Sequence, residues 1–258
     1  MTSYTTPTDR FLLQDRVVLV TGGSRGLGRE MVKAFAGVGA HVVIASRKFD
    51  QCKELADEIE ATTDRQALPY ACHVGNWDEI DPMVDAAYER FGKLDVVVNN
   101  AGMSPLYDHV VNVTESLWDK VIDVNLKGPY RLLAYAGTRM VESGNGGSII
   151  TVSSGGAIRP APNIVPYAAA KAGLNAMTVG FSRTFGPTVR VNCIMPGPFY
   201  TDISKAWDIP TVKERQKEQY SLERAGEPEE IIGAALYFAS DASSFTTGAI
   251  LAVDGGMP

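Results

Sequence analysis

The sequence predicts an α/β fold in which a doubly wound parallel sheet of about seven strands has helices on both faces. Two observations predict it. Short, mostly apolar runs alternate along the chain with segments whose apolar residues recur at helical spacing. A glycine-rich turn joins the first such run to the first helical segment. Strict alternation implies right-handed crossovers, which bring the carboxyl ends of the strands to one edge of the sheet, where ligands bind.

The strands are predicted where the chain is apolar and often β-branched over a short length, as buried parallel strands are: residues 16–20, 41–45, 68–72, 94–98, 148–152, 189–193 and 250–253. Helices are predicted between them from the helical period of the apolar residues, near residues 26–37, 50–60, 79–91, 115–141, 167–185 and 229–239. Pro166 introduces the helix at 167–185, and Asp50 is expected to be the N-cap of the helix at 50–60.

Composition favours one protein domain that acts on small molecules. The chain has 258 residues and a net charge of −6, with acidic and basic residues interspersed, which argues against a nucleic-acid surface. No apolar run approaches the roughly 18 residues of a membrane span, and the first residues do not resemble a secretion signal. We therefore expect a polar tail at residues 1–12, a single domain at 13–258, a cytoplasmic location and no membrane or nucleic-acid partner.

The residue types that most often bind metals are few and far apart: Cys52, Cys72, Cys193, His41, His73 and His109. None of the cysteines forms a Cys-x-x-Cys pair, and the histidines lack ligand spacing. The cysteines are typical of small buried side chains in a reducing compartment. No catalytic metal is expected.

The first motif is the glycine loop Thr21-Gly-Gly-Ser-Arg-Gly-Leu-Gly28. Glycine lets the backbone adopt positive φ and approach a ligand closely, and the N–H groups at the start of the next helix attract phosphate. A tight turn without a ligand is the alternative interpretation. The flanking strand and helix favour a dinucleotide site instead.

The second motif is Tyr167-Ala-Ala-Ala-Lys171. A free tyrosine has a pKa near about 10, so it transfers protons poorly at neutral pH unless its anion is stabilised. Positions 167 and 171 share one helix face, and the Lys171 ammonium is expected to lower the pKa of the Tyr167 phenol. A surface Tyr and Lys on an ordinary amphipathic helix is the alternative. Ser154, 13 residues before Tyr167, disfavours it.

The end of the second predicted strand indicates which cofactor binds. Proteins that bind NAD place an acidic residue there for the ribose 2′-hydroxyl, whereas this chain reads Ser46-Arg47-Lys48. Arg25 in the glycine loop adds another cation, and a guanidinium binds a phosphate in a bidentate manner. The sequence therefore predicts NADP(H). A basic patch that contacts only water is the alternative.

Six ordered motifs resemble the short-chain dehydrogenase/reductase family from about residue 13 to residue 256. The matches are the glycine loop, Asn99-Asn-Ala-Gly102, Asn125, Ser154 with Tyr167-x-x-x-Lys171, Pro196-Gly197 and Val253-Asp-Gly-Gly256. The resemblance implies a Rossmann-like fold and a catalytic role for Asn125, Ser154, Tyr167 and Lys171.

In that resemblance, Ser154 hydrogen-bonds the substrate carbonyl oxygen and Tyr167 exchanges its proton with the substrate. Lys171 grips the nicotinamide ribose, and Asn125 holds a water that leads from Lys171 to solvent. Asn125 lies in the middle of a predicted helix, where asparagine is unfavourable, so a local kink is expected there. A solvent-facing asparagine is the alternative.

Residues expected to bind the cofactor come from all the motifs: Thr21, Gly22, Ser24, Arg25, Gly26, Leu27, Gly28, Ser46, Arg47, Lys48, His73, Val74, Asn100, Ala101, Gly102, Tyr167, Lys171, Pro196, Gly197 and Thr201. One position departs from the family pattern. His73 stands where an Asp usually meets the adenine amino group, so adenine recognition is expected to fall to the Val74 backbone or to a changed side-chain contact.

The expected function is hydride transfer between NADP(H) and a carbonyl or secondary alcohol substrate. The strings Cys72-His-Val-Gly75, Ser46-Arg-Lys48 and Leu117-Trp-Asp-Lys120 resemble a branch with NADP-dependent carbonyl and retinal reductases. A 3-oxoacyl-thioester reductase is one alternative, disfavoured by the segment Met103-Ser-Pro-Leu-Tyr107. A dinucleotide-sensing protein without turnover is the other, disfavoured because the catalytic residues are retained.

Substrate identity stays open among alcohols, ketones, sugars and acyl thioesters. Residues 199–220 are expected to form a mobile lid, and its aromatics, with Tyr107, Ile158, Pro162 and Ile164, suggest an apolar pocket. These side chains are equally consistent with core or interface positions. The small residues Ala168, Ala169, Ala172, Gly173 and Ala176 on one helix predict burial against a second copy, and the family resemblance extends this to a homotetramer.

Overall fold

The computed structural model describes residues 6–201, 204 and 209–258, and its centre is one sheet of seven strands. All neighbouring strands are parallel, in the order β3-β2-β1-β4-β5-β6-β7. Their bounds are β1 Val17–Thr21, β2 His41–Ser46, β3 Ala67–Ala71, β4 Val96–Asn99, β5 Gly147–Val152, β6 Val189–Pro196 and β7 Ile250–Val253. The order reverses between β1 and β4, which makes the sheet doubly wound and confirms the predicted Rossmann-like class.

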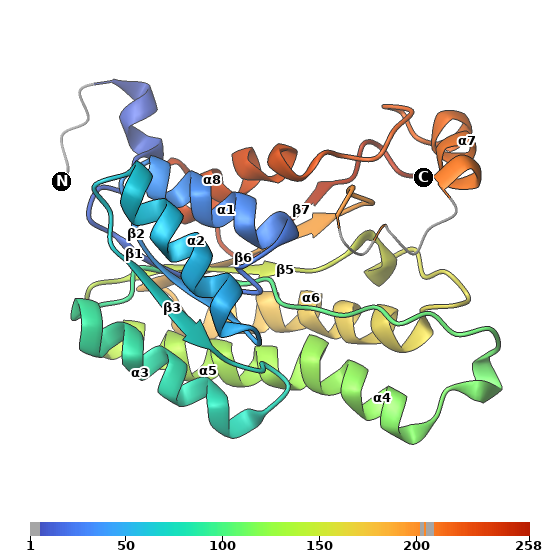
Figure 1. Ribbon diagram of the computed structural model, residues 1–258, viewed down its shortest axis with the longest axis horizontal. Coiled ribbons are helices and arrows are strands. Elements are labelled where there is room, and N and C mark those ends of the chain that lie inside the picture. Colours follow the sequence, from blue (N-terminus) through green and yellow to red (C-terminus); the bar gives the residue numbers. More distant parts are fainter. Residues whose placement is uncertain (1–5, 202–203, 205–208) are drawn as a thin grey trace.

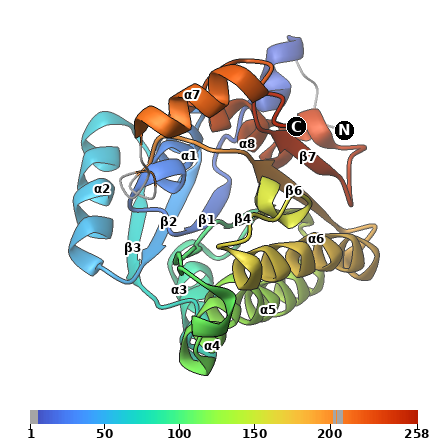
Figure 2. The same ribbon diagram turned by 90° about the vertical axis from the view of Figure 1, so that its right-hand side faces the viewer.

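Helices cover both faces of the sheet (Figures 1 and 2). The α-helices are α1 Gly26–Gly37, α2 Phe49–Thr62, α3 Ile80–Phe91, α4 Glu115–Ile122, α5 Gly128–Glu142, α6 Val165–Phe185, α7 Ile209–Gln219 and α8 Ile232–Ala239. Figure 2 shows α1, α2 and α8 on one side and α3 to α6 on the other. None of the helices within the described residues has the length and apolar character of a membrane span.

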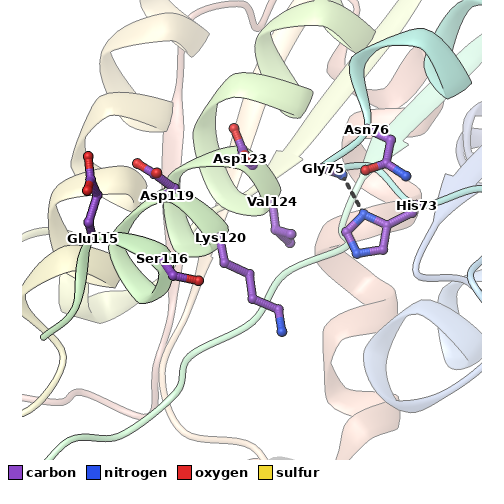
Figure 3. A pocket seen from close by; sticks show the side chains of 9 residues that line it. All are labelled: His73, Gly75, Asn76, Glu115, Ser116, Asp119, Lys120, Asp123 and Val124. Atoms are coloured by element: carbon purple, nitrogen blue, oxygen red, sulfur yellow. Dashed lines mark hydrogen bonds between the residues drawn. The ribbon is translucent and has the colours of Figure 1, made fainter.

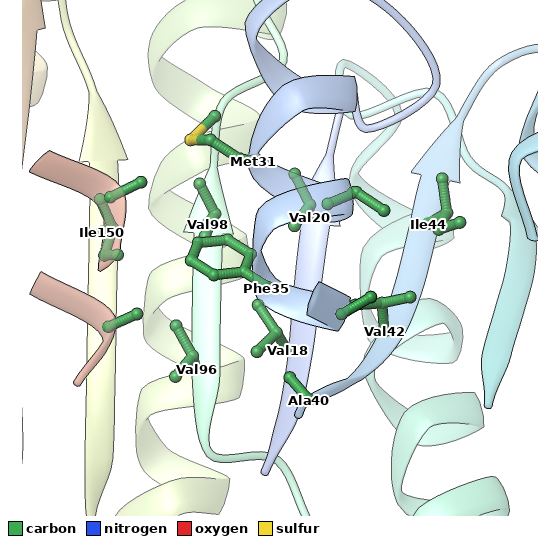
Figure 4. Packing of buried hydrophobic residues seen from close by; sticks show 14 of the residues in the cluster. Val18, Val20, Met31, Phe35, Ala40, Val42, Ile44, Val96, Val98 and Ile150 are labelled. Carbon is green, nitrogen blue, oxygen red and sulfur yellow. The ribbon is translucent and has the colours of Figure 1, made fainter. Parts of the chain in front are cut away.

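Two apolar clusters hold the helices to the sheet. Val18 and Val20 point to one cluster and Val17 and Leu19 to the other, because successive strand side chains face opposite ways. Each β1 residue is buried, which explains why the sequence there is apolar without alternation. On the α1 face, Phe35 packs among the valines of β1 and β4 (Figure 4).

The long helix predicted at 115–141 is interrupted in the structure. Residues Asp123–Lys127 form a π-helical turn between α4 and α5. Asn125 lies within this turn, and its Nδ2 donates to the carbonyl oxygens of Val121 and Met103, each at 2.9 Å. A side chain that binds backbone in this way competes with regular helix, so the α-helical hydrogen bonding is interrupted at Asn125, the position where a kink was expected.

Other element boundaries also differ from prediction. Asp50 is not the N-cap of α2: the helix begins at Phe49, its N-cap is Lys48, and Asp50 lies in the first turn, where a carboxylate favours the helix dipole. The predicted helix at 229–239 begins as a 3-10 helix over Pro228–Ile231. In the expected N-terminal tail, Pro7–Phe11 form a 3-10 helix, with Thr6 and Asp9 bonded reciprocally in a capping box.

Substitution of the buried Phe35 tests this packing directly. Phe35 is fully buried, so Phe35→Ala removes a ring from a filled core, and we expect a loss of about 3–5 kcal/mol in the free energy of unfolding. Urea denaturation followed by circular dichroism measures it. Phe245→Ala is the matched control because Phe245 is fully exposed, and it should change stability by less than about 0.5 kcal/mol. Equal effects of the two substitutions would contradict the packing.

Candidate active site

A cavity of about 1060 Å³ opens at the carboxyl edge of the sheet. Its walls come from the segments that follow six of the strands, β1 to β6, together with α7 and the residues after β7. This is where the reversal of strand order leaves a crevice in a doubly wound sheet. The cavity is large enough for an extended ligand with several chemical groups.

The glycine loop forms one wall of the cavity. Gly22 and Gly26 have φ of +64° and +51°, which side-chain-bearing residues rarely adopt. A Cβ at Gly28 would overlap the carbonyl oxygen of Gly22, so the backbone there has room for glycine alone. Helix α1 starts at Gly26 without a side-chain cap, which leaves its first N–H groups able to bind an anion. This cradle fits the pyrophosphate of a dinucleotide.

Thr21 lies beneath the loop rather than on the cavity wall. Its buried hydroxyl donates to the Val98 carbonyl at 3.3 Å and accepts from the N–H groups of Asn100 and Ala101 at 3.1 and 3.2 Å. Asn100 in turn donates through Nδ2 to the carbonyls of Thr21 and Gly22. These bonds tie the ends of β1 and β4 together. Thr21 therefore supports the site without facing it.

Ser46, Arg47 and Lys48 lie together on the wall at the end of β2. The Ser46 hydroxyl is 3.0 Å from that of Ser24 in the glycine loop. Arg47 and Lys48 are exposed, and in the part of the chain that the structure describes no carboxylate pairs with either. Arg25 lines the same cavity. Gln51, one turn into α2, also lines it and was not predicted.

His73 and Val74 line the wall after β3. The His73 Nδ1 accepts the N–H of Gly75 at 3.1 Å, and its backbone N–H donates to Glu79 at 2.7 Å. With Nδ1 occupied as an acceptor, Nε2 is the nitrogen left for a ligand, and in neutral imidazole it is a donor. The position therefore has the opposite hydrogen-bonding polarity to the Asp of the family pattern.

A second pocket of about 480 Å³ adjoins the cavity and shares His73, Lys120 and Val124 with it. Figure 3 shows His73 bonded to Gly75 beside the side chains of α4. The carboxylates Glu115 and Asp119 lie on this second pocket and not on the main cavity.

Ser154, Tyr167 and Lys171 come together at the other end of the cavity. Ser154 follows β5, and its hydroxyl accepts the N–H of Gly156 at 3.1 Å. Tyr167 stands half-buried in the first turn of α6. Lys171 is 3% exposed; its Nζ donates to the Val152 carbonyl at 2.8 Å and lies 5.7 Å from the centre of the Tyr167 ring.

Burial governs the titration of this group. Burial raises the pKa of the Tyr167 phenol, and the hydrogen bond with the Ser154 hydroxyl opposes this rise. Burial lowers the pKa of Lys171 to about 8. The expected lowering of the Tyr167 pKa by Lys171 is not found in the protein alone: burial raises this pKa, the Ser154 hydroxyl opposes the rise, and Lys171 is not among the causes. Tyr167 is held in its protonated form at neutral pH.

Asn125 lies behind the cavity wall, fully buried. Its Oδ1 accepts the N–H of Met103 at 3.1 Å. Gly102 separates it from the reactive end, since a Cβ at Gly102 would lie 3.0 Å from the Asn125 Oδ1 and 3.4 Å from the Lys171 Nζ. A side chain at this position would therefore crowd both the Asn125 Oδ1 and the Lys171 Nζ.

Of the side chains expected in an apolar pocket, Pro162 and Ile164 line the cavity. Tyr107 does not: its hydroxyl donates to the Pro162 carbonyl and accepts from the Val165 N–H, each at 2.9 Å, so it holds the loop in place. Ile158 is exposed and is not on the wall. Within the expected lid, Phe199 and Thr201 line the cavity, residues 209–219 form α7, and 202–203 and 205–208, including Trp207, lie outside the described residues.

Val212, Gln216, Gln219 and Tyr220 line the cavity from within the expected lid. The wall residues that were not predicted for the site include Met103, Ser104, Leu106, Lys120, Arg159, Asn163, Met257 and Pro258. Met103, Ser104 and Leu106 follow the motif Asn99-Asn-Ala-Gly102 closely, and this position in the sequence could have predicted them. Met257 reaches the site only through the tertiary fold. Every predicted cofactor residue except Thr21 is on the wall, as are all predicted catalytic residues except Asn125.

The cavity is strongly cationic. Among the described residues, six basic side chains line it: Arg25, Arg47, Lys48, Lys120, Arg159 and Lys171. No Asp or Glu side chain among the described residues lines it, and no group of three or more possible metal ligands occurs in that part of the chain. Such a wall suits a ligand with several negative charges.

Known proteins resemble the chain over nearly its whole length. A family model described as Enoyl-(Acyl carrier protein) reductase matches residues 22–258. The Aspergillus oryzae protein named Short chain dehydrogenase/reductase astE is 37% identical over 252 residues, covering 96% of this chain and 97% of that protein. Human Dehydrogenase/reductase SDR family member 4 is 34% identical over 256 residues, covering 97% and 90%.

The fold likeness extends to a solved structure. The NADPH-dependent 3-quinuclidinone reductase from Rhodotorula rubra superimposes with a TM-score of 0.92 at 27% identity, covering 99% of this chain and 96% of that one. The family match, the relatives and the cavity geometry agree. The chain belongs to the short-chain dehydrogenase/reductase family and is an oxidoreductase that transfers a hydride between a nicotinamide cofactor and a carbonyl or alcohol substrate.

Proposed function

We propose that the protein is an NADP(H)-dependent carbonyl reductase or secondary-alcohol dehydrogenase. One observation supports this most: a single cavity has Ser154, Tyr167 and Lys171 at one end and Ser46, Arg47 and Lys48 at the other, with no described acidic side chain on its wall. The first group suits proton transfer to a carbonyl oxygen. The second suits the 2′-phosphate that distinguishes NADP from NAD.

In the proposed mechanism, Ser154 hydrogen-bonds the carbonyl oxygen and Tyr167 donates its phenolic proton to that oxygen. The bound nicotinamide supplies the hydride to the carbonyl carbon. The product is the alcohol, and Tyr167 is left as a phenolate that the Lys171 ammonium stabilises. Lys171 then returns a proton to Tyr167, and we propose that a water held near Asn125 restores the proton of Lys171, since Gly102 lies close to both side chains.

The remaining cofactor contacts are proposed along the cavity wall. The N–H groups at the start of α1 and the glycine loop bind the pyrophosphate, while His73 and the Val74 backbone meet the adenine. Lys171 also binds the nicotinamide ribose, and Thr201 contacts the carboxamide. The name of the Rhodotorula enzyme, an NADPH-dependent reductase, supports the cofactor assignment.

A 3-oxoacyl-thioester reductase is the second candidate: the matching family model is described as an enoyl-(acyl carrier protein) reductase, which shares the acyl-carrier-protein group but reduces a carbon–carbon double bond rather than a 3-oxo carbonyl. The two candidates separate in a screen of NADPH oxidation over ketones, aldehydes and 3-oxoacyl thioesters. NADPH binding without turnover on any of them would instead point to a dinucleotide sensor.

We propose further that the protein is a single domain over residues 13–258, acts in the cytoplasm and assembles as a homotetramer. Exposed surface in the isolated chain supports assembly. The small residues Ala169, Ala172 and Ala176 on α6 are exposed, and the edge strand β7 exposes Ile250 and Leu251. An unpaired apolar edge strand and an exposed small-residue face are both explained if a second copy covers them.

The proton donor is tested by Tyr167→Phe. Removing the hydroxyl should lower kcat for carbonyl reduction by about 10²- to 10⁴-fold while the dissociation constant for NADPH changes little, because general acid catalysis is lost and the ring is kept. The rate of NADPH oxidation at saturating substrate measures kcat, and fluorescence titration measures the dissociation constant for NADPH. Tyr130→Phe on α5, outside the cavity, is the matched control and should keep normal kcat. Near-normal turnover in Tyr167→Phe would rule out the assignment.

The pKa of Lys171, lowered to about 8, predicts a pH dependence of cofactor binding. Below pH 8 the ammonium is charged and binds the ribose; above it the free protein loses that proton, so NADPH affinity should fall by up to about tenfold per pH unit. Isothermal titration from pH 6.5 to 9.5 measures the dissociation constant. In Lys171→Arg the cation persists, and the break near pH 8 should disappear. A constant affinity across this range in the native protein would contradict a charged role for Lys171.

The 2′-phosphate site is tested by Arg47→Ala. A charge-assisted pair is worth about 1.5–3 kcal/mol, so NADPH should bind at least about tenfold more weakly while NADH binding is unchanged. The preference for NADPH in the native protein should also shrink as salt rises. Arg183→Ala, an exposed position on α6 away from the cavity, controls for net charge. Equal weakening of both cofactors would show that Arg47 does not contact the 2′ position.

A further inference from the structure

Arg159 is a cation of the cavity wall that the proposed reaction does not use. It follows the short helix Gly155–Ala157, and its backbone N–H donates to the Gly155 carbonyl at 3.0 Å. The loop that contains it begins at Ser154 and ends at Tyr167, the two residues proposed to hold and protonate the carbonyl oxygen. Arg159 therefore belongs to the substrate side of the cavity.

The other cations on the wall lie near the proposed cofactor groups, beside Tyr167 or at the second pocket. Arg25, Arg47 and Lys48 belong to the loops after β1 and β2, where the adenosine 2′-phosphate is proposed to bind. Lys171 is beside Tyr167, and Lys120 lies with His73 at the second pocket. The pyrophosphate has the start of α1. Arg159 is thus the positive charge left over on the substrate loop once the cofactor charges are matched.

The Arg159 guanidinium is only loosely neutralised. Its Nη1 lies 3.8 Å from the Asp254 Oδ2, which is an ion-pair contact but too long for a hydrogen bond. The Asp254 Oδ1 already accepts the Gly256 N–H at 3.0 Å. Among the described residues no hydrogen bond engages the Arg159 guanidinium, so its N–H donors remain able to bind an incoming acceptor.

The wall next to Arg159 is apolar except for Asn163. Pro160, Ala161, Pro162 and Ile164 follow it on the loop and line the cavity, and Met257 faces the same loop, since a Cβ at Gly155 would lie 3.5 Å from its side chain. A ligand that reaches Arg159 from Tyr167 therefore has a hydrophobic body between its carbonyl group and an anionic end.

We propose that the substrate is a carbonyl compound, or the corresponding alcohol, that has a carboxylate at a distance from the reacting carbon, and that Arg159 binds this carboxylate. The inference rests on the proposed function of the cavity. A guanidinium matches the two oxygens of a carboxylate in plane. One guanidinium, partly offset by Asp254, balances a single negative charge better than the nearly double charge of a phosphate monoester.

Asp254 then acts as a stand-in partner for Arg159 when no substrate is bound. Because the carboxylate of Asp254 competes with that of the substrate, removing its charge should strengthen substrate binding. Asp254→Asn keeps an oxygen to accept the Gly256 N–H while removing the charge, so it isolates this competition.

The test compares keto acids with their methyl esters at saturating NADPH: 4-oxopentanoate, 5-oxohexanoate and 4-acetylbenzoate against the three esters. For each pair, kcat/KM of the acid is divided by kcat/KM of its ester, and this ratio is compared between the native protein and each variant. The comparison cancels differences in reactivity among the carbonyl groups. We expect Arg159→Gln to lower this ratio at least about tenfold, mainly through KM of the acid, with the esters little changed. Asp254→Asn should raise the ratio.

Arg183→Gln removes the same charge from an exposed site on α6 and should leave the ratio unchanged. Turnover of the esters with an acid-to-ester ratio that Arg159→Gln does not alter would overturn the role of Arg159 while leaving the proposed reductase function standing. Loss of ester turnover together with acid turnover in Arg159→Gln, in a variant that still binds NADPH, would also overturn it, because the effect would then not depend on the carboxylate. Absence of turnover with all six compounds and with the simple ketones and aldehydes of the wider screen would instead count against the proposed function.

Discussion

The site depends on the hydrogen bonds that join the carboxyl ends of β1 and β4. Consecutive halves of a doubly wound sheet leave a crevice there, and the crevice serves a ligand only if its floor is rigid. The buried hydroxyl of Thr21 supplies that rigidity by bonding three backbone groups of the β4 segment. Asn100 repeats the connection in the opposite direction. The glycine loop above can then keep Gly28 against the Gly22 carbonyl, a contact that no other residue permits.

A buried cation is the second constraint, and it works against stability. Lys171 is almost without contact to water and has one fixed acceptor, the Val152 carbonyl. Burying a charge without an opposite charge is unfavourable, which is why the pKa of Lys171 falls to about 8. In the proposed mechanism this cost has a use, because low hydration strengthens the attraction between the Lys171 ammonium and the phenolate that forms at Tyr167 after proton transfer. Catalytic groups are commonly held in this way at some expense of folding free energy.

Much of this architecture was predictable because it depends on local patterns. The strands of the sheet are apolar since both faces are covered, and the glycine loop, the Ser154 to Tyr167 spacing and the Ser46-Arg47-Lys48 string are each contiguous or regularly spaced. The π-helical turn was predictable only as a kink at Asn125, because its hydrogen bonds to Met103 and Val121 involve a partner 22 residues away as well as one four residues away. The direction of the Tyr167 pKa shift was not predicted correctly, because a lowered pKa was expected and the pKa is raised. The sequence shows that Lys171 and Tyr167 share a helix face, but it does not show that Lys171 is buried and Tyr167 half-buried, and burial is the largest cause of both pKa shifts.

The directions of the two pKa shifts also distinguish the two senses of the reaction. In the proposed mechanism, carbonyl reduction needs a protonated phenol at Tyr167, whereas alcohol oxidation needs the phenolate. Burial raises the pKa of Tyr167, so the free protein holds the proton required for reduction and would have to lose it before oxidation. The lowered pKa of Lys171 has a matching effect, because above about pH 8 the cation that stabilises the phenolate is itself lost. In the unliganded site Tyr167 therefore holds the proton with which carbonyl reduction would start, but the raised pKa makes the phenol a weaker acid, so proton donation depends on stabilisation of the phenolate that it leaves.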